Sequence, residues 1–250
     1  MAIRKYFADK DNTITNAFEA DLTTRGTGSN MGLSDALEVF SIYGQVSNSS
    51  GYTKERSRIL IKFPVTGTTS IKADRTSGVL PVSGSVSFYL NLYNAVTPFT
   101  LPKQFTLNLY ALDQSWIEGS GLDMESYKDI GASNWIDRLD QTAWTITGAT
   151  FQNTASVTPW AANAYFENGD EDLAVDITPY VESWIKGAGD SGFENYGFLV
   201  ALAPTEESAS QSYYDKKFFA RSSEYFFKRP TIEARWDNSN TDDRGSFFYS

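Results

Sequence analysis

The chain has 250 residues, with 31 Asp and Glu against 21 Lys and Arg, and it contains neither cysteine nor histidine. These absences exclude disulfides, thiolate or imidazole metal sites, cysteine nucleophiles and Ser-His-Asp catalysis. The net charge of −10 argues against nucleic acid and anionic membranes as partners, because an acidic surface repels phosphate groups. Catalysis would have to use carboxylates, Lys, Tyr or Ser alone, so we expect a protein that is not an enzyme.

No apolar run approaches the length that crosses a bilayer. The first residues, MAIRKYFADKDN, lack the apolar segment of a secretory signal, so we expect a protein that is made in the cytoplasm without an export signal. The length suits one large β domain. The sequence predicts a single domain over residues 1–237, followed by a polar tail over 238–250.

Alternation of apolar and polar residues predicts antiparallel strands with one buried face. The clearest segments are SRILIKF at 57–63, GSVSFYLNLYN at 84–94 and QFTLNLYAL at 104–112. Further strands are expected at 36–43, 143–147, 172–177, 196–203, 216–221 and 230–236. Polar connections are expected at 21–35, 44–56, 66–79, 113–142 and 204–214. The pattern predicts an all-β antiparallel sandwich.

The long connection at 113–142 contains Trp116 and Trp135, and Trp144 follows it closely. Connections of this length either carry function or pack as ordered loops. Three indole side chains are more often buried than held ready for a ligand. We therefore expect them to seal an edge of the sandwich.

One segment, ITPYVESWIKG at 177–187, has the marks of a short helix at about 179–186. Thr178 can cap its start, Pro179 suits the first turn, and Gly187 provides a left-handed exit. An apolar stripe at helical spacing predicts one buried face, formed by Val181, Trp184 and Ile185.

Two acidic clusters are candidates for an acid/base pair of the kind that hydrolyses glycosides. The clusters comprise Glu118, Asp123 and Glu125, and Asp170, Glu171 and Asp172. With so many acids in the chain, we interpret both as solvated acidic surface and assign no catalytic residue.

Calcium is the alternative for the oxygen-rich stretches, because hard cations prefer carboxylate and amide oxygens. The candidate ligands are Asp9, Asp11 and Asn12, and Asn168, Asp170 and Asp172. Neither stretch has the full spacing of a calcium-binding loop, so turn chemistry explains them better. No cofactor is expected.

Two groups of aromatic residues are candidates for binding. Tyr213 and Tyr214 lie in the polar stretch TEESASQSYYDKK and are the best exposed pair for a glycan. Phe247, Phe248 and Tyr249 follow the polar residues 237–246. These three either fold back onto their own domain or dock on a neighbouring subunit as an arm.

Four stretches, in order, resemble DNRLRE-type domains, a family of carbohydrate-binding-module-like β-sandwiches related to disaggregatase repeats. They are SRILIKFPV at 57–65, LNLYALDQSWIEGSG at 107–121, DITPYVESWIKG followed by NYGFLVAL within 176–202, and FFARSSEYFFKRPTIEARW at 218–236. The resemblance implies a jelly-roll-like sandwich in which the helix plugs one end of the core. It also implies that the last stretch forms a closing hairpin.

Fold alone does not fix function. The chain also resembles structural proteins of tailed bacteriophages, particularly of marine and cyanobacterial phages. This resemblance implies a virion protein of the head, neck, tail or fibre that adheres to other virion proteins or to copies of itself. The alternative is a module that binds host surface glycans.

Overall fold

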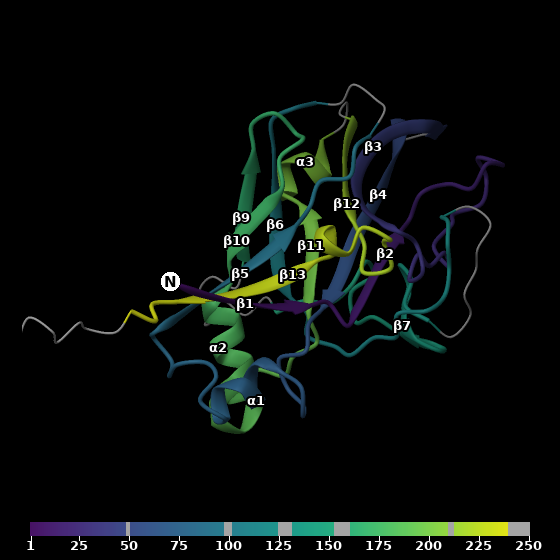
Figure 1. Ribbon diagram of the computed structural model, residues 1–250. Coiled ribbons are helices and arrows are strands. Elements are labelled where there is room, and N and C mark those ends of the chain that lie inside the picture. Colours follow the sequence, from purple (N-terminus) through teal and green to yellow (C-terminus); the bar gives the residue numbers. More distant parts are fainter. Residues whose placement is uncertain (49–50, 98–101, 125–131, 153–160, 210–212, 240–250) are drawn as a thin grey trace, which may run out of the picture.

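The computed structural model describes residues 1–48, 51–97, 102–124, 132–152, 161–209 and 213–239. Within them the chain forms an antiparallel β-sandwich of a four-stranded and a seven-stranded sheet, with a further two-stranded ribbon (Figure 1). The predicted all-β, jelly-roll-like fold is confirmed. The division into residues 1–237 and a tail stays a prediction, because residues 240–250 lie outside the described residues.

The four-stranded sheet has the order β1-β13-β5-β10, and its strands are β1 (Ala2–Phe7), β13 (Thr231–Trp236), β5 (Val86–Leu92) and β10 (Leu173–Asp176). The seven-stranded sheet has the order β12-β3-β4-β11-β6-β9, with β2 also paired to β4. Its strands are β12 (Tyr213–Phe219), β3 (Ala36–Asn48), β4 (Gly51–Lys62), β11 (Phe198–Leu202), β6 (Phe105–Ala111), β9 (Ala161–Phe166) and β2 (Lys10–Thr15). The ribbon consists of β7 (Asp137–Leu139) and β8 (Thr142–Ala143).

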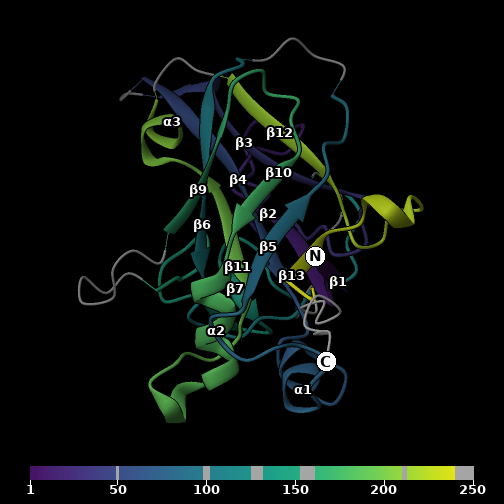
Figure 2. The same cartoon turned by 60° about the vertical axis from the view of Figure 1, so that its left-hand side comes forward.

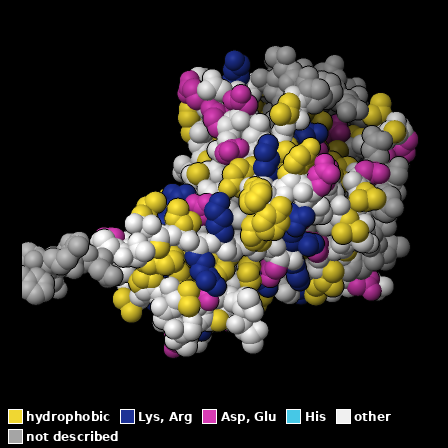
Figure 3. Space-filling view, in the orientation of Figure 1, with side chains coloured by type: hydrophobic (Ala, Val, Ile, Leu, Met, Phe, Trp, Pro, Cys, Tyr) yellow, Lys and Arg dark blue, Asp and Glu magenta, His cyan; other side chains and the backbone are white. Residues whose placement is uncertain are grey.

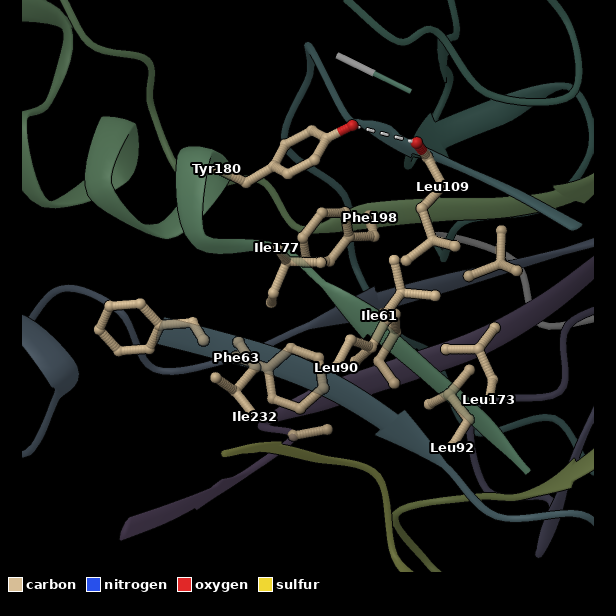
Figure 4. Close-up of a cluster of buried hydrophobic side chains, with 14 of the residues drawn as sticks. Ile61, Phe63, Leu90, Leu92, Leu109, Leu173, Ile177, Tyr180, Phe198 and Ile232 are labelled. Atoms are coloured by element: carbon tan, nitrogen blue, oxygen red, sulfur yellow. Dashed lines mark hydrogen bonds between the residues drawn. The ribbon is translucent and has the colours of Figure 1, made fainter. Parts of the chain in front are cut away.

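The main core lies between the inner faces of the two sheets (Figure 4). Alternation works as predicted, since every second residue of β5 and β6 is buried in this core. Leu90, Leu92 and Ile232 of the smaller sheet belong to the same buried cluster as Ile61 and Phe198 of the larger one.

Helix α2 (Thr178–Lys186) confirms the predicted helix and covers the lower end of the sandwich in Figures 1 and 2. Val181 and Trp184 are buried and Ile185 packs against the core. The Trp184 ring lies 4.7 Å from that of Phe198. Gly187 has the expected positive φ, of 80°. The Thr178 cap was predicted wrongly, because its Oγ1 accepts the N–H of Phe88, at 2.8 Å, and so ties the helix to β5.

A second hydrophobic layer covers the other face of the seven-stranded sheet. Trp116, Trp135 and Trp144 are all buried, as predicted, but they pack over Leu60 and Leu199 of the central strands and do not seal an edge of the sandwich. The indole N–H of Trp116 donates to the carbonyl oxygen of Tyr196, at 2.9 Å. The segment that carries these residues lies on the right in Figure 1. The larger sheet separates it from β5 and β10 of the smaller sheet.

Three sequence predictions need correction. The expected polar connection at 44–56 is taken up by β3 and β4, and the strand expected at 143–147 shrinks to β8. The prediction of a closing hairpin at 218–236 is wrong, because β12 pairs with β3 and both edges of β13 are occupied, by β1 and by β5. Residues 220–230 therefore cross from one sheet to the other. Two further short helices, α1 (Ile71–Thr76) and α3 (Pro204–Ser208), were not expected.

Replacing Trp184 by alanine is expected to lower the free energy of unfolding by about 3–5 kcal/mol, because it opens a cavity at the end of the core. Urea unfolding followed by circular dichroism measures the loss. Lys186→Ala, at an exposed position of the same helix, is the control and should change stability by less than about 0.5 kcal/mol. A loss below about 1 kcal/mol for Trp184→Ala would show that α2 does not seal the core.

Candidate functional site

The carboxylate of Glu118 is held in a fixed ion pair. Arg221 Nη2 lies 2.8 Å from both carboxylate oxygens, and the backbone N–H of Asp11 donates to Oε1, also at 2.8 Å. These contacts tie the long connection to β2 and to the end of β12. Of the other acids predicted beside Glu118, Asp123 is exposed and Glu125 lies outside the described residues.

Asp11 is fully buried beside this ion pair. Burial raises the pKa of Asp11 to about 7, and the neighbouring Glu118 carboxylate acts in the same direction. The backbone N–H of Arg221 donates to Oδ2, at 2.5 Å, and opposes the increase. A buried carboxyl group with a raised pKa can be a general acid, but a substrate must reach it. Asp11 is 0% exposed, so it is better suited to a structural role.

The acidic cluster at 170–172 lies beside a buried lysine ammonium. Lys216 is 1% exposed, and its Nζ donates to Asn94 Oδ1 at 2.7 Å, Gly169 O at 2.9 Å and Glu171 O at 2.8 Å. Burial lowers the pKa of Lys216 to about 8, and the carboxylates of the cluster oppose this. The ammonium group of Lys216 therefore already binds the carbonyl oxygens of this turn.

The turn that carries the second set of calcium candidates is closed by Glu171 itself. Its carboxylate accepts the backbone N–H groups of Asn168, at 2.7 Å, and Gly169, at 2.8 Å. At the first set, Asn12 is buried and donates to Ser133. Among the described residues, no group of three or more acidic side chains is arranged to hold a metal ion. These contacts support the interpretation of the second stretch as turn chemistry. For the first stretch that interpretation is wrong, because Asp11 and Asn12 lie in strand β2.

Tyr213 and Tyr214 lie on strand β12 and do not form a joint platform. Neighbouring residues of a strand point to opposite faces. Tyr213 is 53% exposed, whereas Tyr214 packs against the core and its ring meets that of Phe105, with the centroids 6.0 Å apart. The predicted arm residues Phe247, Phe248 and Tyr249 lie outside the described residues.

The most distinctive exposed feature is a group of aromatic side chains, which we call the aromatic surface: Phe7, Tyr225, Phe226 and Phe227. Tyr225 is 56% exposed, Phe226 49% and Phe227 88%. The Phe226 ring lies 4.7 Å from that of Phe7 and 5.5 Å from that of Phe227, between centroids. Exposed apolar clusters of this kind mark interaction sites in soluble proteins.

Two cations border the aromatic surface. Lys228 Nζ lies 4.8 Å from the centroid of the Phe219 ring, and Arg229 Cζ lies 5.5 Å from that of Phe226. Neither cation has a carboxylate partner among the ion pairs of the described residues. In Figure 3, which has the orientation of Figure 1, hydrophobic side chains in the middle of the face are bordered by Lys and Arg side chains.

The aromatic surface is held in place by its backbone. The short turn η2 (Phe226–Lys228) is closed by the N–H of Lys228 on Tyr225 O, at 2.8 Å. Arg229 Nε donates to Ser223 O, at 2.8 Å, and the N–H of Ala8 donates to Pro230 O, at 3.1 Å. The aromatic rings are thus presented on a fixed turn, which reduces the entropy lost on binding.

Sequence reasoning missed this surface, because the segment was interpreted as a hairpin. One feature of the sequence indicates an exposed ring: Tyr225, Phe226 and Phe227 are consecutive, and consecutive residues of a strand cannot all point to its buried face. The polar surroundings of Tyr213 and Tyr214 point to these residues instead, and Tyr214 is partly buried against the core.

A scan against models of known protein families finds no match to this chain, and a search of curated protein sequences finds none either. The resemblance to DNRLRE-type domains therefore stays a prediction. No helix within the described ranges is long and apolar enough to cross a membrane.

Asp11 gives the fold a pH-dependent stability. Between about pH 4 and pH 7 the folded chain keeps a proton on Asp11 that the unfolded chain releases, so the free energy of unfolding should fall as the pH rises through this window. The loss is at most about 4 kcal/mol. Burial also raises the pKa of Asp215 to about 7, which adds a second contribution of the same sign.

Asp11→Asn should therefore remove part of this slope, and urea unfolding at pH 4.5, 5.5 and 7 measures it. The exposed Asp190→Asn variant is the control and should keep the whole slope. An Asp11→Asn variant with an unchanged slope would show that Asp11 titrates normally in the folded chain.

Proposed function

We propose that this protein is a non-enzymatic binding protein that acts by protein–protein adhesion through its aromatic surface. The observation that carries the proposal is the fixed display of three consecutive exposed aromatic residues beside Lys228 and Arg229. Aromatic and arginine side chains are the groups that contribute most to binding at protein interfaces.

The arrangement of the acidic groups supports a role in binding. Glu118 is engaged by Arg221, Asp11 is closed off from solvent, and the cluster at 170–172 is organised around Lys216. Hydrolysis by paired carboxylates requires two of them to face one substrate. The carboxylates of Glu171 and Asp172 accept backbone N–H groups, so they too have structural partners.

We further propose that the protein works as a structural component of a tailed-phage particle, attached to its head, neck, tail or fibre. The support is the resemblance in sequence style, together with a rigid sandwich that offers a fixed adhesive surface. The partner would be another virion protein or a copy of this chain.

Replacing Phe227 by serine should leave the fold intact and weaken binding to the assembled particle by about 30-fold or more, as truncation of a central interface aromatic does. Particles are grown with the wild-type or variant chain, purified, and assayed for its abundance by mass spectrometry. Val82→Ser, which changes a 72% exposed residue outside the aromatic surface, is the matched control. Equal incorporation of all three chains would refute adhesion through the aromatic surface. Absence of the wild-type chain from the particles would refute a role in the phage particle.

A second candidate, binding of host glycans, is favoured by one observation. The outer face of the four-stranded sheet carries a shallow hollow of about 440 Å³, which Tyr89, Arg235 and Trp236 help to line. The guanidinium carbon of Arg235 lies 4.2 Å from the centroid of the Tyr89 ring. Aromatic rings beside hydrogen-bond donors suit the faces and hydroxyl groups of a sugar.

Under this second candidate the chain should be retained on a polysaccharide column, and Tyr89→Ala should abolish the retention. Tyr213→Ala, at the exposed tyrosine of β12, tests the site that the sequence suggested. Phe227→Ser is the control and should be retained like the wild type. Passage of the wild-type chain through columns of several surface polysaccharides would argue against a glycan ligand.

A further inference from the structure

Strand β1 forms a border of the four-stranded sheet. It pairs with β13, from Ala2 opposite Trp236 to Phe7 opposite Thr231, and it has no second strand partner within the described part of the chain. The element beyond its open side is α1, which Figures 1 and 2 both place below it. A border strand is a template on which another strand can form hydrogen bonds.

The register shows which backbone groups of β1 face the open side. The N–H of Ala8 donates to Pro230 O, at 3.1 Å, which continues the pairing of Phe7 with Thr231 by one residue. Hydrogen-bonded and non-hydrogen-bonded pairs alternate in an antiparallel ladder. The even-numbered residues Ala2, Arg4 and Tyr6 therefore bond to β13. The N–H and C=O groups of Ile3, Lys5 and Phe7 point to the open side.

A groove follows this open side. Its volume is about 490 Å³; the five consecutive residues from Ile3 to Phe7 line one wall, and Pro64, Thr69, Ser70 and Asp74 line the other. Because residues of both faces of β1 line the same hollow, it runs along the border of the sheet. Asp74 fixes the far wall, since its Oδ2 accepts from Tyr6 Oη at 2.6 Å and from Arg4 Nε at 2.7 Å.

The charges at the groove discriminate between occupants. Arg4 and Lys5 leave 46% and 47% of their side chains exposed, although Arg4 is paired with Asp74 at 2.7 Å and Lys5 with Glu233 at 2.9 Å, on a chain whose net charge is −10. A second copy of β1 in antiparallel pairing would bring the same cations close to one another, and like charges across a strand pair are destabilising. An acidic strand would instead meet the exposed parts of these two cations, for which it would compete with Asp74 and Glu233.

We propose that the open side of β1 binds an extended, acidic segment of a partner protein by strand addition. Main-chain hydrogen bonds to Ile3, Lys5 and Phe7 would supply the affinity, and Arg4 and Lys5 would select acidic side chains. This site shares Phe7 with the aromatic surface but uses the backbone of that residue, and it does not require the rings of Tyr225, Phe226 and Phe227.

The test uses ¹⁵N-labelled protein and the peptide acetyl-SDVDVDVS-amide, followed by NMR. Before the peptide is added, the amides of Ile3, Lys5 and Phe7 should exchange with deuterium faster than those of Arg4 and Tyr6. With the peptide at saturation, the exchange of these three amides should slow by at least about tenfold, because a new ladder protects them. Their signals should also shift.

Two further peptides and two variants sharpen the result. The basic peptide acetyl-SKVKVKVS-amide and a form of the acidic peptide with N-methylated valines should bind far more weakly. Lys5→Glu should reverse the preference between the acidic and basic peptides. Phe227→Ser should leave the response unchanged, which separates this inference from the proposed adhesive role. An acidic peptide that leaves the three amides unaffected, or that binds no better than the basic peptide, would overturn the proposal.

Discussion

The structure depends on one constraint: the central strands β4 and β11 of the seven-stranded sheet are buried on both faces. Ile59 and Ile61 of β4 point into the main core, while Leu60 between them points into the second layer with the tryptophans. Strand β11, FLVAL, divides its residues in the same way, and all five are buried. A sheet covered on both sides needs the long connection as a structural layer, which explains the indole side chains in it.

This constraint determines where function can lie. The described cores are filled by side chains, and the buried charge of Lys216 and the partly buried charge of Glu118 are engaged by partners that fix loops. Burying an ionic group costs free energy unless the group is paired and hydrogen-bonded. Charges that are held in this way are better suited to fixing the structure than to catalysis. The groups that remain for contact lie outside, on the turn between the two sheets and along the border of the smaller sheet.

The sequence predicted those elements in which the local spacing of apolar residues indicates the buried face. β5 and β6 alternate cleanly, and α2 shows a proline in its first turn and an apolar stripe ending near a glycine. β2 could not be predicted, because KDNTIT is polar and yet Asp11 and Asn12 are buried by the long connection more than 100 residues away. The pairing of β13 depends on β1, at the opposite end of the chain, so local pattern could not reveal that residues 220–230 cross between sheets.

The central claim is that the turn at Tyr225, Phe226 and Phe227 becomes buried when the protein binds its partner. Hydroxyl-radical footprinting with mass spectrometry measures this directly, on the free chain and on purified particles that contain it. The claim predicts that the three aromatic residues lose most of their reactivity in the particle while the exposed Val82 keeps its own. Equal oxidation of Phe227 in both states would contradict it.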